Sequence, residues 1–458
     1  MWRTSSYSIS ISLFFVAISL AEGPDSSNVY TLEGVVQTAL RNNHDLTSAR
    51  LEVQRASARV REAWGYALPK IDLSARYTRA LKKPVFFLPD FANPGSDRVS
   101  AIEIGSTHAF DMTVSAEQVL FNSSVFVGVG TARIYSKAAE EVYRAKCLET
   151  ITAAKKAFYS VLVAGEVLKM IRQNLTNAEE NYQNTRLLAA SGLVSEYDEL
   201  RAAVALDNLH PELLRVENAY SLALNNLKSM IGAPYISRLE IHGVLEADTT
   251  VEFQLESVVE RVVKTNPSLA AMRYQTEVSD AVISVERSSY LPRLSAFGNY
   301  QYTAQNNMFN FSTGDFIASS QIGLSLSMNI FSGLQTNARV EQAELDLRKS
   351  QEAINGMEIR LQTSAESLVL QIRQARQRIA AQGRTVEQAE RGYRIASSRF
   401  ANGLGIQLEV NDAQLGLTRA RVNRIEAIYE HLTATAELEQ MLGRLPEYVI
   451  EETDEDTE

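Results

Sequence analysis

One pattern occurs twice in the chain of 458 residues, and this duplication restricts the possible folds more than any other feature. Thr31-Leu-Glu-Gly-Val-Val-Gln37 matches Gln254-Leu-Glu-Ser-Val-Val-Glu260, which lies 223 residues later. The same offset brings Leu68-Pro-Lys-Ile71 onto Leu291-Pro-Arg-Leu294 without a gap. Because chance similarity does not keep register over so many positions, we expect one structural unit that is built twice.

The duplication sets the domain boundaries. Residues 22–248 are assigned to the first repeat, which ends in a connecting segment at 233–253, and residues 249–446 to the second. Residues 1–21 combine a positive start, a short apolar segment and small residues, which predicts a secretory signal peptide. The acidic residues 447–458 are expected to be a solvated, disordered tail.

Charge and cysteine content exclude several classes of protein. The net charge of −10 argues against a nucleic-acid-binding protein, which would carry a basic stripe. Cys147 is the single cysteine, so no intrachain disulfide can form and no thiolate metal cluster is expected. The histidines show no metal-ligand spacing, and neither a nucleophile elbow nor a phosphate-binding loop occurs. We therefore expect neither an enzyme nor a cofactor.

Each repeat is predicted to begin with a helix of about thirty-five residues, 32–64 and 255–288. Each helix ends at a Leu-Pro pair, because Pro69 and Pro292 cannot continue it. Alternating apolar and polar residues then predict β-hairpins at about 70–121 and 293–331, with the intervening loops at 81–107 and 304–319.

Two structures fit these hairpins. A half-buried sheet on a soluble core and a transmembrane barrel with a polar lumen both require one apolar face, although segments of about ten alternating residues favour the barrel. Four strands per chain cannot close a barrel around a channel, so closure needs further copies and predicts a symmetric oligomer.

The longest predicted helices follow the strands and carry an apolar seam whose spacing alternates between three and four residues. This seam includes Ala154 to Ala189 in the first repeat and Leu361 to Phe400 in the second. Each helix ends at an Ala-x-Gly-Leu turn, which contains Gly192 or Gly403, and returns as a shorter helix over 195–231 or 408–442. Pro211 is expected to kink the first returning helix.

The duplicated order of helix, Leu-Pro strand, loop, second strand and long coiled-coil hairpin resembles that of the TolC-like outer membrane efflux proteins. The resemblance extends over essentially the whole mature chain. It implies an α+β membrane protein that forms a homotrimeric channel-tunnel, with a transmembrane β-barrel of four strands per subunit and an α-helical coiled-coil barrel. Its place would be the outer membrane of a Gram-negative-type bacterium, with a large periplasmic portion.

The resemblance also implies a function and partners. Such a protein is the exit duct of a tripartite efflux or type I secretion system, which passively conducts substrates from an inner-membrane pump that it reaches through a periplasmic adaptor. The expected partners are two further copies of the chain, the adaptor, the pump and outer membrane lipid. A secreted or surface coiled-coil structural protein, such as an adhesin, is the alternative, although the repeated alternating strands argue against it.

The second tip carries the residues that the resemblance assigns to a gate. The family stretch Gly-x-Arg-x-x-x-Asp-x-x-Asp-Ala corresponds here to Gly403-Leu-Gly-Ile-Gln-Leu-Glu409-Val-Asn-Asp412-Ala413. Glu409 and Asp412 match the acids of the constriction, and Asp198 matches an acid in the other repeat. Gly405 stands where the family has its latch arginine, so Arg201, Arg399 or Phe400 is expected to hold the closed state instead.

The same two acids can be interpreted from helix geometry alone. Glu409 and Asp412 are three residues apart and share a helix face, so three symmetric copies would form a carboxylate ring of the kind that selects cations. Two solvated surface acids would show the same spacing.

The resemblance also implies a surface that contacts the adaptor. It consists of residues at both tips: Gly192, Leu193, Ser195, Gly403, Leu404 and Gln407.

Overall fold

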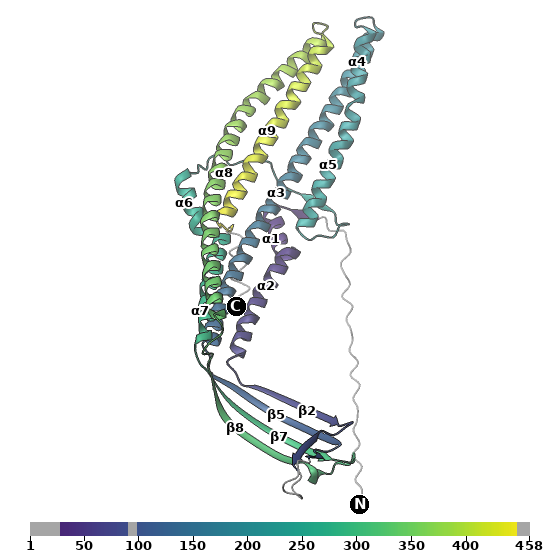
Figure 1. Cartoon of the computed structure of the whole chain (residues 1–458). Helices are drawn as coiled ribbons and strands as arrows, with labels where there is room; N and C mark the ends of the chain where they lie inside the picture. The colour runs from purple at the N-terminus through teal and green to yellow at the C-terminus, as the bar shows by residue number, and fades with distance from the viewer. Residues whose placement is uncertain (1–27, 90–98, 447–458) are drawn as a thin grey trace, which may run out of the picture.

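The computed structural model describes residues 28–89 and 99–446. The predicted signal peptide and acidic tail lie outside the described residues. The chain is an elongated assembly of helices with a four-stranded sheet at one end and two helical hairpin tips at the other (Figure 1). Among the described residues, no helix is both long enough and apolar enough to cross a membrane.

Two long helices form the body of the molecule. Helix α3 (Ser123–Ala190) has 68 residues and helix α8 (Gln335–Ala401) has 67. At a rise of 1.5 Å per residue, each is about 100 Å long. The returning chain is the single helix α9 (Gln407–Met441) in the second repeat, but the two helices α4 (Glu196–Asp207) and α5 (Leu209–Met230) in the first.

The break in the first returning chain replaces the predicted kink. Helix α4 ends at Asp207, and Pro211 falls in the first turn of α5, where a missing backbone N–H costs little. The same proline inside a continuous helix would have removed a hydrogen bond.

The opening helix of each repeat is also divided, and the prediction of one continuous helix was wrong. The first repeat has α1 (Leu32–Asn42) and α2 (His44–Gly65), and the second has α6 (Leu255–Thr265) and α7 (Pro267–Arg287). A 3₁₀ turn at Ser288–Tyr290 follows α7. Asn43 and Asn266 stand at the breaks with extended backbone, where each caps the next helix. A good N-cap residue in extended conformation ends one helix and begins another.

The sheet consists of β2 (Lys70–Arg79), β5 (His108–Phe121), β7 (Arg293–Asn306) and β8 (Ile317–Ser327), in the spatial order β2-β5-β7-β8. All neighbouring pairs are antiparallel. Pro69 and Pro292 directly precede β2 and β7. Strands β2 and β8 are therefore the edges of an open sheet.

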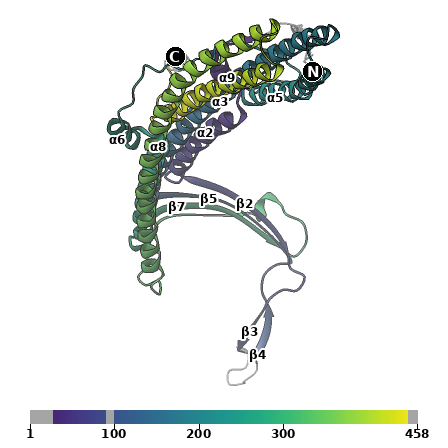
Figure 2. The ribbon, with the colours of Figure 1, turned by 90° about the horizontal axis from the view of Figure 1, so that it is seen from above.

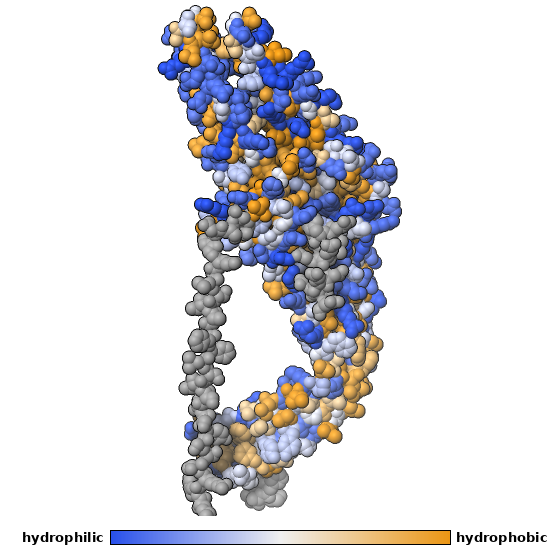
Figure 3. Space-filling view, turned by 180° about the vertical axis from the view of Figure 1, so that it is seen from behind, coloured by the Kyte–Doolittle hydropathy of each residue, from blue (hydrophilic) through white to orange (hydrophobic). Residues whose placement is uncertain are grey.

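The strand register separates the two faces of the sheet by polarity. Leu73, Val114 and Tyr300 lie opposite one another across three strands. One residue along, Asp72, Ser115, Asn299 and Gln321 form a polar row on the other face. Figure 3 shows apolar residues over the sheet and its junction with the helices, whereas hydrophilic residues predominate on the upper helices. Large apolar side chains on the sheet are exposed, among them Ile71, Leu73, Tyr77, Tyr300, Ile322, Leu324 and Leu326.

The segment expected to be a loop at 81–107 contains a second hairpin. Strands β3 (Val85–Pro89) and β4 (Val99–Glu103) pair antiparallel and project beyond the sheet (Figure 2). A two-stranded parallel sheet joins β1 (Asn28–Tyr30) to β6 (Leu239–Ile241) in the connecting segment. Strands β1, β3 and β4 escape prediction because each is too short to show alternation.

The apolar seams form the core where α1 and α6 pack on the long helices. One cluster surrounds Ala154, Val161 and Leu227, and a second surrounds Ala365, Ile372 and Leu438. The predicted seam is mostly buried in its lower part, where Val161 and Leu168 are buried and Ala164 is half-buried. Toward the tips, positions such as Ala178 and Ala389 are only half-buried. The upper hairpins are therefore held by fewer apolar contacts than the base.

Candidate functional site

Both hairpin tips begin with the same helix end. Gly192 and Gly403 have φ of +71° and +72°, which is the left-handed conformation that favours glycine. Leu193 N–H donates to Leu188 O at 2.9 Å, and Leu404 N–H donates to Arg399 O at 2.8 Å. These bonds satisfy the last carbonyls of α3 and α8 in the manner of a Schellman motif. The duplicated Gly-Leu pair thus encodes the same turn twice.

The first tip then forms a capping box. Ser195 Oγ accepts a hydrogen bond from Asp198 N–H at 3.2 Å, and Asp198 Oδ2 accepts from Ser195 N–H at 3.3 Å. The hydroxyl of Ser195 also donates to Asp198 Oδ2 at 2.7 Å. Within this chain, the carboxylate of Asp198 is thus engaged in starting α4. Arg201 lies over the ring of Tyr197, 5.6 Å from its centroid, on the same helix.

The second tip is built differently because Ile406 occupies the N-cap position and supplies no side-chain cap. The guanidinium of Arg399 crosses the turn instead. It donates to Leu404 O at 3.0 Å, and its Nη1 lies 3.8 Å from Glu409 Oε2. A Cβ at Gly405 would lie 3.1 Å from that carboxylate oxygen and 3.3 Å from Arg399 Cβ. Arg399 and Glu409 therefore fill the space beside Gly405.

The expected site residues differ in exposure. Glu409 and Asp412 are exposed, as are Gly192, Gly403 and Ser195. Leu193 and Leu404 are 72% and 71% exposed. Phe400 is buried against the end of the hairpin. These positions place two carboxylates and two exposed leucines at the free end of the molecule.

Gln407 does not fit its expected role as a contact surface. Its side chain is 0% exposed, and its Nε2 donates to Asn411 Oδ1 at 3.1 Å while its Oε1 has no partner among the described residues. The sequence prediction included it in the adaptor surface because it lies beside the Gly403 turn. A residue buried in this way cannot contact a partner protein in this conformation, so we remove it from the proposed surface.

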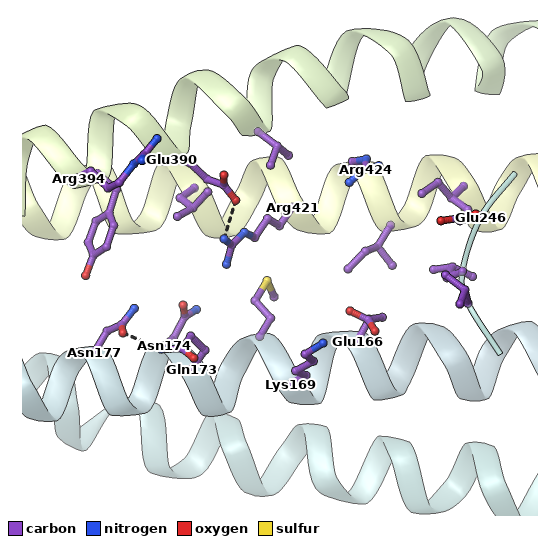
Figure 4. A pocket seen from close by; sticks show the side chains of 18 residues that line it. Glu166, Lys169, Gln173, Asn174, Asn177, Glu246, Glu390, Arg394, Arg421 and Arg424 are labelled. Atoms are coloured by element: carbon purple, nitrogen blue, oxygen red, sulfur yellow. Dashed lines mark hydrogen bonds and ion pairs between the residues drawn. The ribbon is translucent and has the colours of Figure 1, made fainter. Parts of the chain in front are cut away.

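A cleft runs between the two hairpins below their tips. It includes a cavity of about 930 Å³ lined by α3, α8, α9 and residues 244–246 (Figure 4). A second cavity of about 330 Å³ lies closer to the tips, and Asn177 and Tyr393 line both. Charged groups of both signs face the larger cavity, among them Glu166, Lys169, Glu246, Glu390, Arg394, Arg421 and Arg424.

Two interactions define the walls of this cleft. Arg421 Nη2 and Glu390 Oε1 are 2.7 Å apart and join α9 to α8. Burial raises the pKa of the Tyr393 hydroxyl, and the nearby carboxylate of Glu180 on α3 adds to this effect. Sequence reasoning missed the cleft because its residues are spread over three helices and no local motif marks them.

This geometry is that of a known family. The family model described as "Outer membrane efflux protein" matches residues 35–233 and 258–444, which are the two repeats. The chain belongs to this family. The match shows a family of outer membrane channel proteins rather than of enzymes.

Curated relatives and solved structures agree with this assignment. The chain is 24% identical over 443 residues to outer membrane protein TolC of Vibrio cholerae. The alignment covers 94% of this chain and 95% of that protein. It is 23% identical over 349 residues to alkaline protease secretion protein AprF of Pseudomonas aeruginosa, with coverages of 74% and 70%. The Campylobacter jejuni CmeC outer membrane channel superposes with a TM-score of 0.77 at 18% identity, covering 99% of this chain and 98% of that one.

The family assignment confirms the predicted resemblance and the internal duplication. The chain is a TolC-like outer membrane channel protein. The matched region includes both hairpin tips and both strand pairs. The tips and the sheet lie at opposite ends of the molecule (Figure 1).

Proposed function

We propose that this efflux protein acts as a homotrimer, the exit duct of a tripartite efflux or type I secretion system. The single observation that carries the proposal is the family match over both repeats, because the matched residues include the four sheet strands and both hairpin tips. Substrates would pass passively from the periplasmic tips to the sheet end, and an inner-membrane pump would supply the energy.

The open sheet supports assembly with other copies. Strands β2 and β8 each have one neighbour in the sheet order, so each leaves a row of backbone groups without a ladder partner among the described residues. Such edges pair readily with another strand. Three copies of the four-stranded sheet would give twelve strands and a closed barrel. The exposed apolar face would then meet lipid, and the polar row with Asp72 and Gln321 would line the lumen.

The tips would form the periplasmic entrance of the trimer. Threefold symmetry would place three copies each of Glu409 and Asp412 around one axis, and a ring of carboxylates attracts cations and excludes anions. Both side chains are exposed in the single chain, which leaves them available to face a lumen. Asp198 belongs to the proposed constriction as well, with its capping box holding it at the start of α4.

The closed entrance would be held by Arg399. Its contacts to Leu404 O and Glu409 join the end of α8 to the start of α9. The guanidinium of Arg399 thus lies beside Gly405, which stands where the family has its latch arginine. Phe400 supports it from the buried side of the tip. Arg201 is the weaker candidate, since its contact to Tyr197 lies within one helix.

The adaptor would dock at the tips and in the cleft below them. Exposed Leu193 and Leu404 provide apolar contacts, and the cleft carries charges of both signs on its walls. An amphipathic helical hairpin matches such a groove, because its apolar face can enter while its charged flanks pair with the walls. Gly192, Ser195 and Gly403 complete the exposed surface of the tips.

Fractionation and gel mobility test the proposed assembly. The protein should be found in the outer membrane fraction, migrate as a trimer in unheated sodium dodecyl sulfate gels, and dissociate on heating. Purified protein added to a planar lipid bilayer should produce discrete conductance steps. A soluble monomer in the periplasmic fraction that forms no channel would refute the proposal.

A further inference from the structure

Two levels of hydrogen bonds join the first hairpin to the second. At the base, Lys155 Nζ lies 2.6 Å from Glu439 Oε2, and Lys156 pairs with Glu437. Thr152 Oγ1 also donates to Ala436 O at 3.3 Å. The second level lies at Asn174, which is nineteen residues farther along α3, or about 28 Å.

Asn174 uses both ends of its amide to hold α9. Its Nδ2 donates to Thr418 Oγ1 at 3.0 Å, and its Oδ1 accepts from Gln414 Nε2 at 2.9 Å. The side chain is only 7% exposed. Figure 4 shows Asn174 on α3, at the margin of the larger cavity. A buried side-chain amide with both ends satisfied is a specific contact, because each lost bond leaves a polar group without a partner.

The surroundings of Asn174 differ above and below it. Below, Leu168, Ile171 and Val216 form an apolar cluster that packs against Val422 of α9. Above, the 330 Å³ cavity lies between α3 and the upper part of α8 and α9. The larger cavity extends from Asn174 toward the base on the side that faces α8, so water-accessible space adjoins the amide there as well. Figure 1 shows that the two hairpins stand apart at their tips. Among the described residues, the Asn174 amide makes the hydrogen bonds between α3 and α9 that lie nearest to the tips, and the separate arms begin above it.

An amide contact at this place can open and close at little cost. Parting two packed apolar surfaces exposes them to water, which opposes the motion. A buried amide can exchange its protein partners for water, provided that water can reach it. The adjoining cavities supply that access, so the exchange costs less here than in the apolar cluster below.

We propose that Asn174 is a positioning residue of the entrance: a releasable clasp that sets the height at which the two hairpins part when the channel opens. Above Asn174, α3 continues for sixteen residues, or about 24 Å, so a small change of angle at Asn174 moves the tips by several ångström. This inference rests on the proposed function, because it takes the tips to be the channel entrance.

Distance measurement between spin labels tests the clasp. Cysteines introduced at the exposed positions Leu193 and Leu404, in a Cys147→Ser background, would carry one label on each tip of the same chain. Labelled chains would be diluted with unlabelled chains so that most trimers carry a single labelled copy. We expect Asn174→Ala to shift the distance distribution to longer values and broaden it, and to raise the mean single-channel conductance. Gln414→Ala, which removes one of the two bonds, should produce a smaller change of the same sign.

Gln173→Ala is the matched control, since Gln173 lines the same cavity but bonds to Asn177 within α3 at 2.9 Å. Its distances should equal those of the parent protein. Unchanged distances in both Asn174→Ala and Gln414→Ala, or an equal change in Gln173→Ala, would overturn the inference. If Asn174→Ala does not assemble, Gln414→Ala and Thr418→Val decide. A parent protein that forms no channel would refute the proposed function, and the distances would still test the clasp.

Discussion

Asn43 and Asn266 make the same two interactions in the two repeats, although 223 residues separate them. Each side-chain oxygen accepts from the backbone N–H three residues on, at 3.1 Å in both cases. Each side-chain nitrogen donates to a carbonyl at the end of the returning helix, Met230 O at 3.2 Å and Met441 O at 3.0 Å. In each repeat, one asparagine side chain thus caps a helix and bonds to the end of the returning helix, so both interactions are present in both repeats.

Replacing Asn266 should therefore destabilise the second repeat. Asn266→Ala removes an N-cap worth about 1 kcal/mol and a hydrogen bond of similar worth, so we expect a loss of about 2 kcal/mol. Asn266→Asp keeps the capping oxygen but loses the donor to Met441 O, so its stability should lie between that of the parent and that of Asn266→Ala. Thermal unfolding in detergent measures the loss. An Asn266→Ala variant as stable as the parent would show that the joint does not stabilise the hairpin.

Gly443 closes this joint from the other side. Its φ is +66°, and an added Cβ would lie 2.5 Å from Thr265 O, so an alanine would meet both strain and a backbone clash. Gly192 has a similar φ of +71° but open space around it, which makes it the matched control. Gly192→Ala should cost about 1 kcal/mol, whereas Gly443→Ala should cost about 2–5 kcal/mol. Equal losses in the two variants would mean that the clash is relieved by movement of the helix end.

The sequence predicted the fold where a pattern was long or repeated. The seam from Leu361 to Phe400, the Leu-Pro junctions and both Gly-Leu turns required only local periodicity and proline or glycine chemistry. The helix breaks at Asn43 and Asn266 were missed because an asparagine within an apolar pattern is compatible with helix, and tertiary bonds decide otherwise. The predicted apolar seam of the first repeat did not include Asn174, but the structure buries this residue, since two partners on α9 satisfy its amide.

His431 makes stability depend on pH. It is 4% exposed, and burial lowers its pKa below the ordinary value; the charge of Arg376 acts in the same direction and the carboxylate of Asp248 opposes it. As pH falls below about 6.5, the unfolded chain binds a proton that the folded chain resists, so stability decreases. His431→Gln should lose less stability than the parent between pH 7.5 and pH 5.5. A His431→Gln variant that shows the same pH dependence of stability as the parent would contradict this prediction.

Two single substitutions distinguish Arg399 from Arg201 as the residue that holds the entrance closed. Arg399→Gln removes the contacts to Leu404 O and Glu409, and an exposed ion pair is worth about 0.2–1 kcal/mol, so the open population should rise by up to about five-fold. Arg201→Gln removes only a contact within α4 and should leave gating unchanged. Single-channel open probability is the measurement. An effect of Arg201→Gln alone would assign the latch to the first tip.

Glu409 and Asp412 give the most direct test of the proposed entrance. The double variant Glu409→Gln, Asp412→Asn removes two negative charges per chain, or six per proposed trimer, while the shapes of the side chains are retained. If these carboxylates form a ring around the conduction path, the preference for cations over anions should fall several-fold, and block by multivalent cations should weaken. Reversal potentials in a salt gradient measure the first effect and current block the second.

The control for this prediction is Glu196→Gln, which removes an exposed acid from the first turn of α4 without altering the proposed ring. It should leave selectivity and block close to those of the parent.

The local contact between Arg399 and Glu409 makes one further distinction possible, because Glu409→Gln also weakens the latch whereas Asp412→Asn does not. Asp412→Asn alone should therefore change selectivity with unchanged open probability. Unchanged selectivity in the double variant would place both acids outside the constriction.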